Sequence, residues 1–142
     1  MSALVCDTSG LLALFDATED DHPAVSASLE HELGPFVVSP YVLAELDHLL
    51  SRRQGQSASI AALGELTSGA WELPAFGIED VRRARELIER YADQRIGLAD
   101  ASLVLLAGRY RTDRVLTLDH RHFRVLRTTA GHAFELLPAA SR

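Results

Sequence analysis

Two acidic residues stand directly after segments that must be buried, where a carboxylate needs a partner. Asp7 separates two apolar stretches in LVCDTSGLLALFD, and Asp119 follows the apolar run RVLTL. A carboxylate that loses its hydration needs a hydrogen bond, a cation or a metal ion. Asp7 would also serve as the cap of the helix that follows it. Metal binding and helix capping therefore both remain open at this stage.

Two further acids fall on stretches with helical character. Asp100 stands in the first turn of GLADASLVLLAG, where a carboxylate stabilises a helix N-terminus by less than about 1 kcal/mol. Glu45, in SPYVLAELDHLL, falls at the border of the apolar face of its helix. Asp47 lies about 200° further around the same helix. We therefore expect Glu45, and not Asp47, to share a site with the other acids.

Taken together, the four acids indicate one kind of chemistry. Four carboxylates in one pocket would raise one another's pKa values unless a cation compensated their charge. Mg²⁺ suits such a pocket, with Mn²⁺ as an alternative, because it prefers oxygen ligands, keeps several waters and often binds substrate phosphate as well. The pattern therefore favours a metal site for phosphodiester chemistry.

Short β-like runs alternate with longer helical patterns, and these elements must position the acids. We expect strands at 3–6, 36–39, 71–74, 114–118 and 134–138, and helices at 9–15, 23–33, 40–52, 57–67, 78–91 and 98–109. This alternation predicts an α/β fold, a three-layer α/β/α sandwich with a mainly parallel central sheet. Ligands bind at the carboxyl ends of such strands. Asp7 and Asp119 should therefore meet at one edge of the sheet.

Composition limits the class of protein. A length of 142 residues with 47% hydrophobic content predicts one domain spanning residues 1–142. No basic leader precedes an apolar run, and no apolar stretch approaches about 18 residues, so we expect a cytoplasmic chain with no membrane segment. The single cysteine, Cys6, cannot form an internal disulfide, and its apolar neighbours predict a buried position.

Charge divides the chain into two parts. Residues 1–81 contain 2 arginines and 13 acids, whereas residues 82–142 contain 12 arginines and 7 acids. This asymmetry is compatible with a basic surface that attracts nucleic acid, and also with arginines on solvated helix faces.

Four strings carry a resemblance to a known family: VCDTSGLLALFD, SPYVLAEL, GLADASLVLLAGRYRTDRVLTLDHRHF and FELLP. In this order and spacing they resemble PIN-domain ribonucleases, in particular VapC-type toxins of bacterial toxin–antitoxin pairs, over residues 4–138. The resemblance implies that the metal-binding and catalytic acids are Asp7, Glu45, Asp100 and Asp119. It also implies supporting roles for Thr8 and Thr117, although a helix cap and a buried strand hydroxyl explain these two residues equally well.

The resemblance also implies a function and partners. Such a toxin would be a Mg²⁺-dependent endoribonuclease that cleaves transfer, ribosomal or messenger RNA, inhibits translation and growth, and is neutralised by a VapB-type antitoxin. It would usually form a homodimer. Arg114 and Arg121 flank Asp119 and are candidate RNA contacts, because arginine suits bidentate phosphate binding. An antitoxin groove is expected on the helices at 40–52 and 57–67, lined by Leu49, Leu50, Ile60, Leu63 and Leu66, which core packing would also explain.

Other interpretations remain open beside this one. His120 and His122 lack the partners of a structural zinc site, and we expect them to be solvated loop residues or phosphate contacts. Trp71 and Phe123 are expected in the core. A receiver-like or aspartate-based phosphoryl-transfer domain would also use Asp and Mg²⁺, but it ordinarily adds a lysine, and this chain has none. An inactive PIN-like protein-binding module would be expected to lack one of the four acids.

Overall fold

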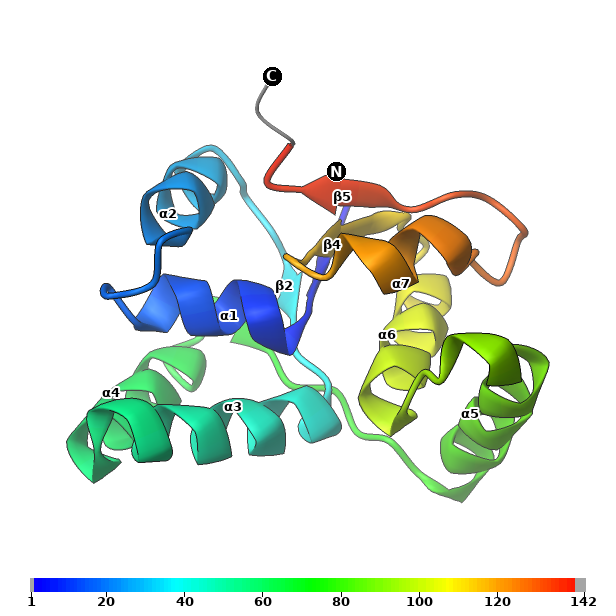
Figure 1. Cartoon of the computed structure of the whole chain (residues 1–142), viewed down its shortest axis with the longest axis horizontal. Helices are drawn as coiled ribbons and strands as arrows, with labels where there is room; N and C mark the ends of the chain where they lie inside the picture. The colour runs from blue at the N-terminus through cyan, green and yellow to red at the C-terminus, as the bar shows by residue number, and fades with distance from the viewer. Residues whose placement is uncertain (1, 140–142) are drawn as a thin grey trace.

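The computed structural model describes residues 2–139 and has a five-stranded sheet at its centre (Figure 1). The strands are β1 (Leu4–Cys6), β2 (Phe36–Val37), β3 (Trp71–Glu72), β4 (Arg114–Leu116) and β5 (Glu135–Leu137). Their order across the sheet is β3-β2-β1-β4-β5, and all four pairings are parallel. The predicted α/β fold with a mainly parallel sheet is confirmed.

Helices connect successive strands and cover both faces of the sheet (Figure 1). They are α1 (Thr8–Phe15), α2 (His22–Glu30), α3 (Pro40–Gln54), α4 (Gln56–Leu66), α5 (Ile78–Arg90), α6 (Leu98–Arg109) and α7 (His120–Val125), with a short 3-10 helix at Ala92–Gln94. Because parallel crossovers are right-handed, the reversal of strand order after β3 puts α1 to α4 on one face and α5 to α7 on the other. None of the helices within residues 2–139 is long and apolar enough to cross a membrane.

The predicted helices are all present, with small differences at their ends. The helix predicted at 23–33 ends at Glu30, where His31 takes the C-cap position. Two short elements were not predicted, α7 and the 3-10 helix. Their length explains this, because neither is long enough to display a repeating apolar face.

The core is built around β1, which lies between β2 and β4 and is buried along its whole length. Cys6 is fully buried there, and this burial raises the pKa of its thiol far above the ordinary range. Phe123 packs edge-to-face on Phe134 with ring centroids 5.7 Å apart. Trp71 lies 5.1 Å from Phe36 between ring centroids. The predicted core positions of Cys6 and Phe123 are therefore confirmed, whereas Trp71 is partly buried and packs against the core at the edge strand β3.

Candidate active site

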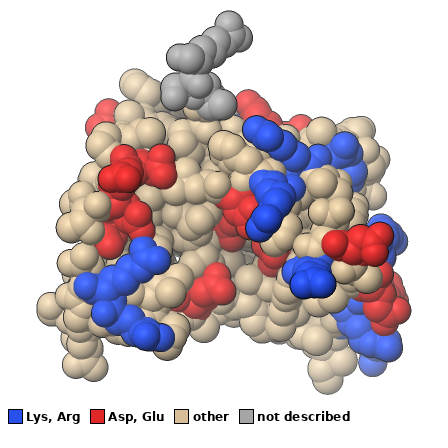
Figure 2. Space-filling model, in the orientation of Figure 1, with Lys and Arg blue, Asp and Glu red and all other residues tan. Residues whose placement is uncertain are grey.

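A cavity of about 590 Å³ opens where the carboxyl ends of β1 and β4 meet. Its lining includes all four acids that the sequence singles out, Asp7, Glu45, Asp100 and Asp119. Figure 2 shows acidic side chains gathered in a hollow of this face, with basic side chains on both sides of it. The fold thus brings together acids up to 112 positions apart in the sequence, Asp7 and Asp119 being the most distant pair of the four.

Asp7 is the most buried of these acids, with 6% of its surface exposed. It ends β1 and caps α1, because its Oδ1 accepts a hydrogen bond of 2.8 Å from the backbone N–H of Thr8. Its Oδ2 accepts a second bond of 2.8 Å from the Thr117 hydroxyl. Burial, together with the charges of the nearby Asp100 and Asp119, raises the pKa of Asp7 to about 6, and the two hydrogen bonds limit this rise. Helix capping and membership of an acidic cluster are therefore both realised by one side chain.

Hydroxyl groups link the two strand ends. The Thr117 hydroxyl, besides donating to Asp7, accepts a bond of 2.9 Å from the backbone N–H of Asp119. Ser9 lies within 3.3 Å of the same hydroxyl and accepts a bond of 2.9 Å from the backbone N–H of Leu118. The Thr8 hydroxyl is buried and has no hydrogen-bond partner among residues 2–139. Ser9 was not among the predicted site residues, although its place two residues after Asp7 was a usable signal.

Asp100 lies in the first turn of α6, where its Oδ2 accepts a bond of 3.3 Å from the backbone N–H of Gly97. Burial raises the pKa of its carboxyl, and the charges of Asp119 and Glu45 act in the same direction. The Gly97 N–H and the charge of His122 oppose this rise. Asp7 and Asp100 are thus two carboxyls that folding makes harder to ionise.

Helix α7 places a histidine between two of the acids. His122 Nδ1 lies 3.0 Å from Asp119 Oδ2 and 3.6 Å from Asp100 Oδ2. Neither contact has hydrogen-bond geometry, and Nδ1 is buried. Asp119 starts α7 and accepts a long bond of 3.4 Å from the backbone N–H of His122. His120 and His122 are therefore not loop residues, because both lie on a helix and His122 lines the cavity. The alternative expectation, that they contact phosphate, stays a prediction.

The two arginines proposed from the sequence as RNA contacts do not line the cavity. Arg114 lies at the opposite, amino end of β4, and its guanidinium donates two bonds of 2.8 and 2.7 Å to the carboxylate of Glu32. This position and pairing remove Arg114 from the candidates. Arg121 is exposed on α7, one turn or less from Asp119. Arg53, at the end of α3, does line the cavity and was missed by the sequence analysis.

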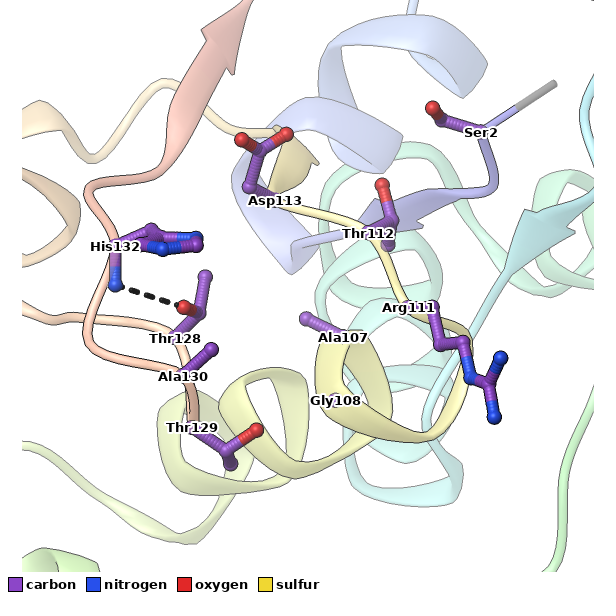
Figure 3. A pocket seen from close by; sticks show the side chains of 10 residues that line it. All are labelled: Ser2, Ala107, Gly108, Arg111, Thr112, Asp113, Thr128, Thr129, Ala130 and His132. Carbon is purple, nitrogen blue, oxygen red and sulfur yellow. Dashed lines mark hydrogen bonds between the residues drawn. The ribbon is translucent and has the colours of Figure 1, made fainter.

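A second cavity, of about 370 Å³, lies at the amino ends of β1 and β4 (Figure 3). Its side chains are mostly threonines and small residues around Arg111, Asp113 and His132, with one carboxylate among them. His132 contributes its backbone N–H to the Thr128 hydroxyl at 3.0 Å, as Figure 3 shows. One carboxylate beside an arginine is a poor metal site. We therefore take the cavity with four acids as the candidate active site.

Comparison with known proteins identifies the chain's family. A model of the PIN domain matches residues 4–127, and the chain belongs to the PIN-domain family. It is 50% identical over 135 residues to Ribonuclease VapC26 of Mycobacterium tuberculosis (strain ATCC 25618 / H37Rv), covering 95% of this chain and 100% of that relative. Within the PIN family it is a VapC ribonuclease, the toxin of a VapBC toxin–antitoxin system. The resemblance drawn from the sequence is confirmed, and the phosphoryl-acceptor and inactive-module alternatives fall away.

Solved structures show the same fold. VapC20 of Mycobacterium tuberculosis, described as a sarcin–ricin loop cleaving toxin, superimposes with a TM-score of 0.75 at 21% identity, covering 80% of this chain and 87% of that chain. VapBC2 from Rickettsia felis, bound to a DNA fragment from their promoter, has a TM-score of 0.68 at 18% identity, covering 94% of this chain and 98% of that chain. DNA-bound VapBC from Salmonella typhimurium has a TM-score of 0.68 at 16% identity, covering 96% of this chain and 98% of that chain.

Proposed function

We propose that this VapC ribonuclease is a Mg²⁺-dependent endoribonuclease whose metal is held by Asp7, Glu45, Asp100 and Asp119, directly or through bound water, with Mn²⁺ as an alternative ion. The observation that carries the proposal is the convergence of four carboxylates on one cavity, two of them with raised pKa values. A raised pKa means that the ionised carboxylate is disfavoured unless it binds a proton or a cation. A divalent ion removes this penalty and leaves all four ionised.

The donor set fits a hard divalent cation. Four of the residues that line the cavity are carboxylates, and the hydroxyl side chains of Thr8 and Ser9 line it with them. Within residues 2–139, no three Asp, Glu, His or Cys side chains lie close enough together to hold one ion by themselves. Mg²⁺ commonly uses one or two carboxylates and completes its shell with water and substrate phosphate. An arrangement of acids spread around a cavity supports this mode of binding.

A bound Mg²⁺ ion would supply a water of lowered pKa and stabilise the charge on the phosphate during hydrolysis. Asp7 and Asp100, the two carboxyls with raised pKa values, would bind the ion or its waters. The Thr117 hydroxyl fixes the orientation of Asp7 and, through the Asp119 N–H, the end of β4. Thr8 offers an unpartnered hydroxyl beside them. Arg121, exposed on α7, would meet the RNA outside the cavity.

The substrate class is RNA, and transfer, ribosomal and messenger RNA are all candidate substrates. The description of VapC20 as a sarcin–ricin loop cleaving toxin supports attack on a loop of a folded RNA. Loops expose unstacked bases, whose edges are paired and hard to reach in an A-form duplex.

Removal of the metal is expected to abolish cleavage. Purified, antitoxin-free protein should cut total cellular RNA into discrete fragments with Mg²⁺ or Mn²⁺ and should leave it intact in chelator, because the four carboxylates repel the phosphate when no cation lies between them. Electrophoresis of the RNA measures both. Cleavage that continues unchanged in excess chelator would contradict the metal requirement.

We also propose that a VapB-type antitoxin covers the hairpin of α3 and α4, and that the toxin forms a homodimer. Structures of relatives as VapBC complexes support an antitoxin partner. Ile60 and Leu63 on α4 are exposed hydrophobic residues, at 63% and 37%. Leu50 and Leu66 are buried in the core. These two residues therefore do not line the groove that the sequence predicted from five leucine and isoleucine residues.

Replacement of Leu63 by arginine is expected to release the antitoxin while the toxin stays folded, because a charge would then face an apolar partner segment. Copurification of a tagged toxin with its co-expressed antitoxin measures this. Ile78→Arg is the matched control, since Ile78 is exposed on α5. Full retention of the antitoxin by a folded Leu63→Arg protein would remove this surface from consideration.

A further inference from the structure

We propose that Arg53 binds an RNA phosphate next to the one that is cleaved, and that Glu19 competes with RNA for the Arg53 guanidinium. The inference rests on the proposed ribonuclease function and adds a substrate-binding residue to it. Arg53 belongs to the last turn of α3 and lines the same cavity as the four acids.

Helix α3 aligns Arg53 with the acidic site. Glu45, Leu49 and Arg53 follow one another at intervals of four residues, and all three line the cavity. Residues four apart lie on one face of a helix. Eight residues span about 12 Å along the helix axis, a distance that a few nucleotides of single-stranded RNA cover. The stripe therefore runs from a metal-site carboxylate, across an apolar side chain, to a guanidinium.

The charges around the cavity give Arg53 a particular role. Among the cavity-lining residues that the structure describes, Arg53 alone carries a fixed positive charge, against four carboxylates. A metal ion at the acids would compensate the scissile phosphate, but the neighbouring phosphates would still face an acidic surface. A guanidinium binds phosphate through two parallel hydrogen bonds. Arg53 is placed to hold one of these neighbouring phosphates.

Glu19 already occupies this guanidinium. Arg53 Nη1 donates a hydrogen bond to Glu19 Oε1, and the two side chains are 49% and 31% exposed. Glu19 lies in the turn between α1 and α2, so the ion pair joins this turn to the end of α3. An exposed ion pair of this kind is weak. A phosphate can therefore replace the carboxylate, and the loss of Glu19 should favour RNA.

Arg53→Gln is expected to weaken RNA binding without changing the chemical step. In single-turnover cleavage, the RNA concentration at half-maximal rate should rise about fivefold, and the maximal rate should stay within about twofold. The salt dependence of binding should fall by about 0.7 in log–log slope, the value for one phosphate contact to a single strand. Arg53→Lys keeps the charge and should recover part of the loss.

Arg52→Gln is the matched control. Arg52 is exposed in the same last turn of α3 and does not line the cavity. Its replacement by glutamine removes the same charge as Arg53→Gln. It should leave binding and cleavage unchanged. Equal effects of Arg52→Gln and Arg53→Gln would overturn the proposal, because they would show a general effect of net charge.

Glu19→Gln tests the competition. It should tighten RNA binding about twofold to threefold, since the exposed ion pair it removes is weak. Glu19→Gln combined with Arg53→Gln should bind no better than Arg53→Gln alone. A gain that persists without Arg53 would show that Glu19 acts by simple repulsion and would overturn the competition.

Binding is also measured directly, by fluorescence anisotropy of a short mixed-sequence single-stranded RNA with the catalytically impaired Asp100→Asn chain in Mg²⁺. The anisotropy measurement distinguishes failure of the Arg53 proposal from failure of the ribonuclease proposal. Cleavage by the unaltered chain with no effect of Arg53→Gln in either assay refutes the role of Arg53 alone. Absence of cleavage refutes the ribonuclease proposal, and the anisotropy comparison of Arg53→Gln with Arg52→Gln then still decides whether Arg53 binds RNA.

Discussion

Replacement of Asp100 by asparagine is expected to lower RNA cleavage by about a thousandfold or more, since the loss of one directed charge in a reaction site has effects of this order. Asp100 projects from the first turn of α6 into the cavity beside Asp119 and His122. Asparagine keeps the size of the side chain but not the charge that a divalent cation needs. Cleavage of total RNA under single-turnover conditions measures the loss.

The fold should survive this change. The Gly97 N–H retains an oxygen acceptor in asparagine, and the lost interaction with the helix N-terminus is worth less than about 1 kcal/mol. Asp93→Asn is the matched control, because Asp93 is an exposed acid a short distance earlier in the chain. An unfolded Asp100→Asn chain, judged by far-ultraviolet circular dichroism, would show that the residue is structural.

Asp7→Asn is expected to stabilise the metal-free protein while it abolishes metal binding. Burial raises the pKa of the folded Asp7 carboxyl to about 6 from its ordinary value of 3.8. The folded state therefore holds a proton that the unfolded state has already released. The stability that this proton supplies is complete below about pH 4 and is lost as the pH rises through about 6. At pH 8 the metal-free protein carries the full cost of an ionised, buried Asp7.

Asparagine removes that cost. The two-unit difference in pKa corresponds to at most about 3 kcal/mol, and imperfect replacement of the Thr8 and Thr117 hydrogen bonds will offset part of it. We expect the metal-free variant to melt about 3 to 8 °C higher than the unaltered chain at pH 8. Near pH 4 the two should melt at similar temperatures.

In Mg²⁺, the unaltered chain should become more stable than Asp7→Asn. Mg²⁺ should raise the melting temperature of the unaltered chain, because it binds only the folded state, and should leave Asp7→Asn unchanged. Calorimetric scans with Mg²⁺ and with chelator measure both effects. A Mg²⁺-dependent stabilisation of Asp7→Asn as large as that of the unaltered chain would exclude Asp7 from the metal site.

The sequence was sufficient to predict the strands and the four acids because each depends on local pattern. Asp7 and Asp119 follow short apolar runs, and parallel strands bring their carboxyl ends to one edge. The capping of α6 by Asp100 and the burial of Thr117 were also readable, since both are local. These features do not require knowledge of distant contacts.

Residues that depend on tertiary geometry were missed. His122 reaches the cavity because the six residues of α7 form a helix capped by Asp119, and a helix of this length has no repeating apolar pattern. Arg53 reaches it because α3 continues to Gln54, two residues beyond the predicted end. Arg114 was wrongly predicted to contact RNA because it is close to Asp119 in the sequence. This closeness does not place Arg114 at the cavity, since Arg114 and Asp119 lie toward opposite ends of β4.

The position of β1 between β2 and β4 has a consequence for the synthesis of the chain. Asp7 is synthesised 110 residues before its hydrogen-bond partner Thr117. Until β4 has been made and has paired with β1, the cavity has no second wall and Asp119 is absent. Domains generally fold as units. The ribonuclease site therefore stays incomplete during synthesis until the segment that carries Thr117 and Asp119 has been made and has paired with β1.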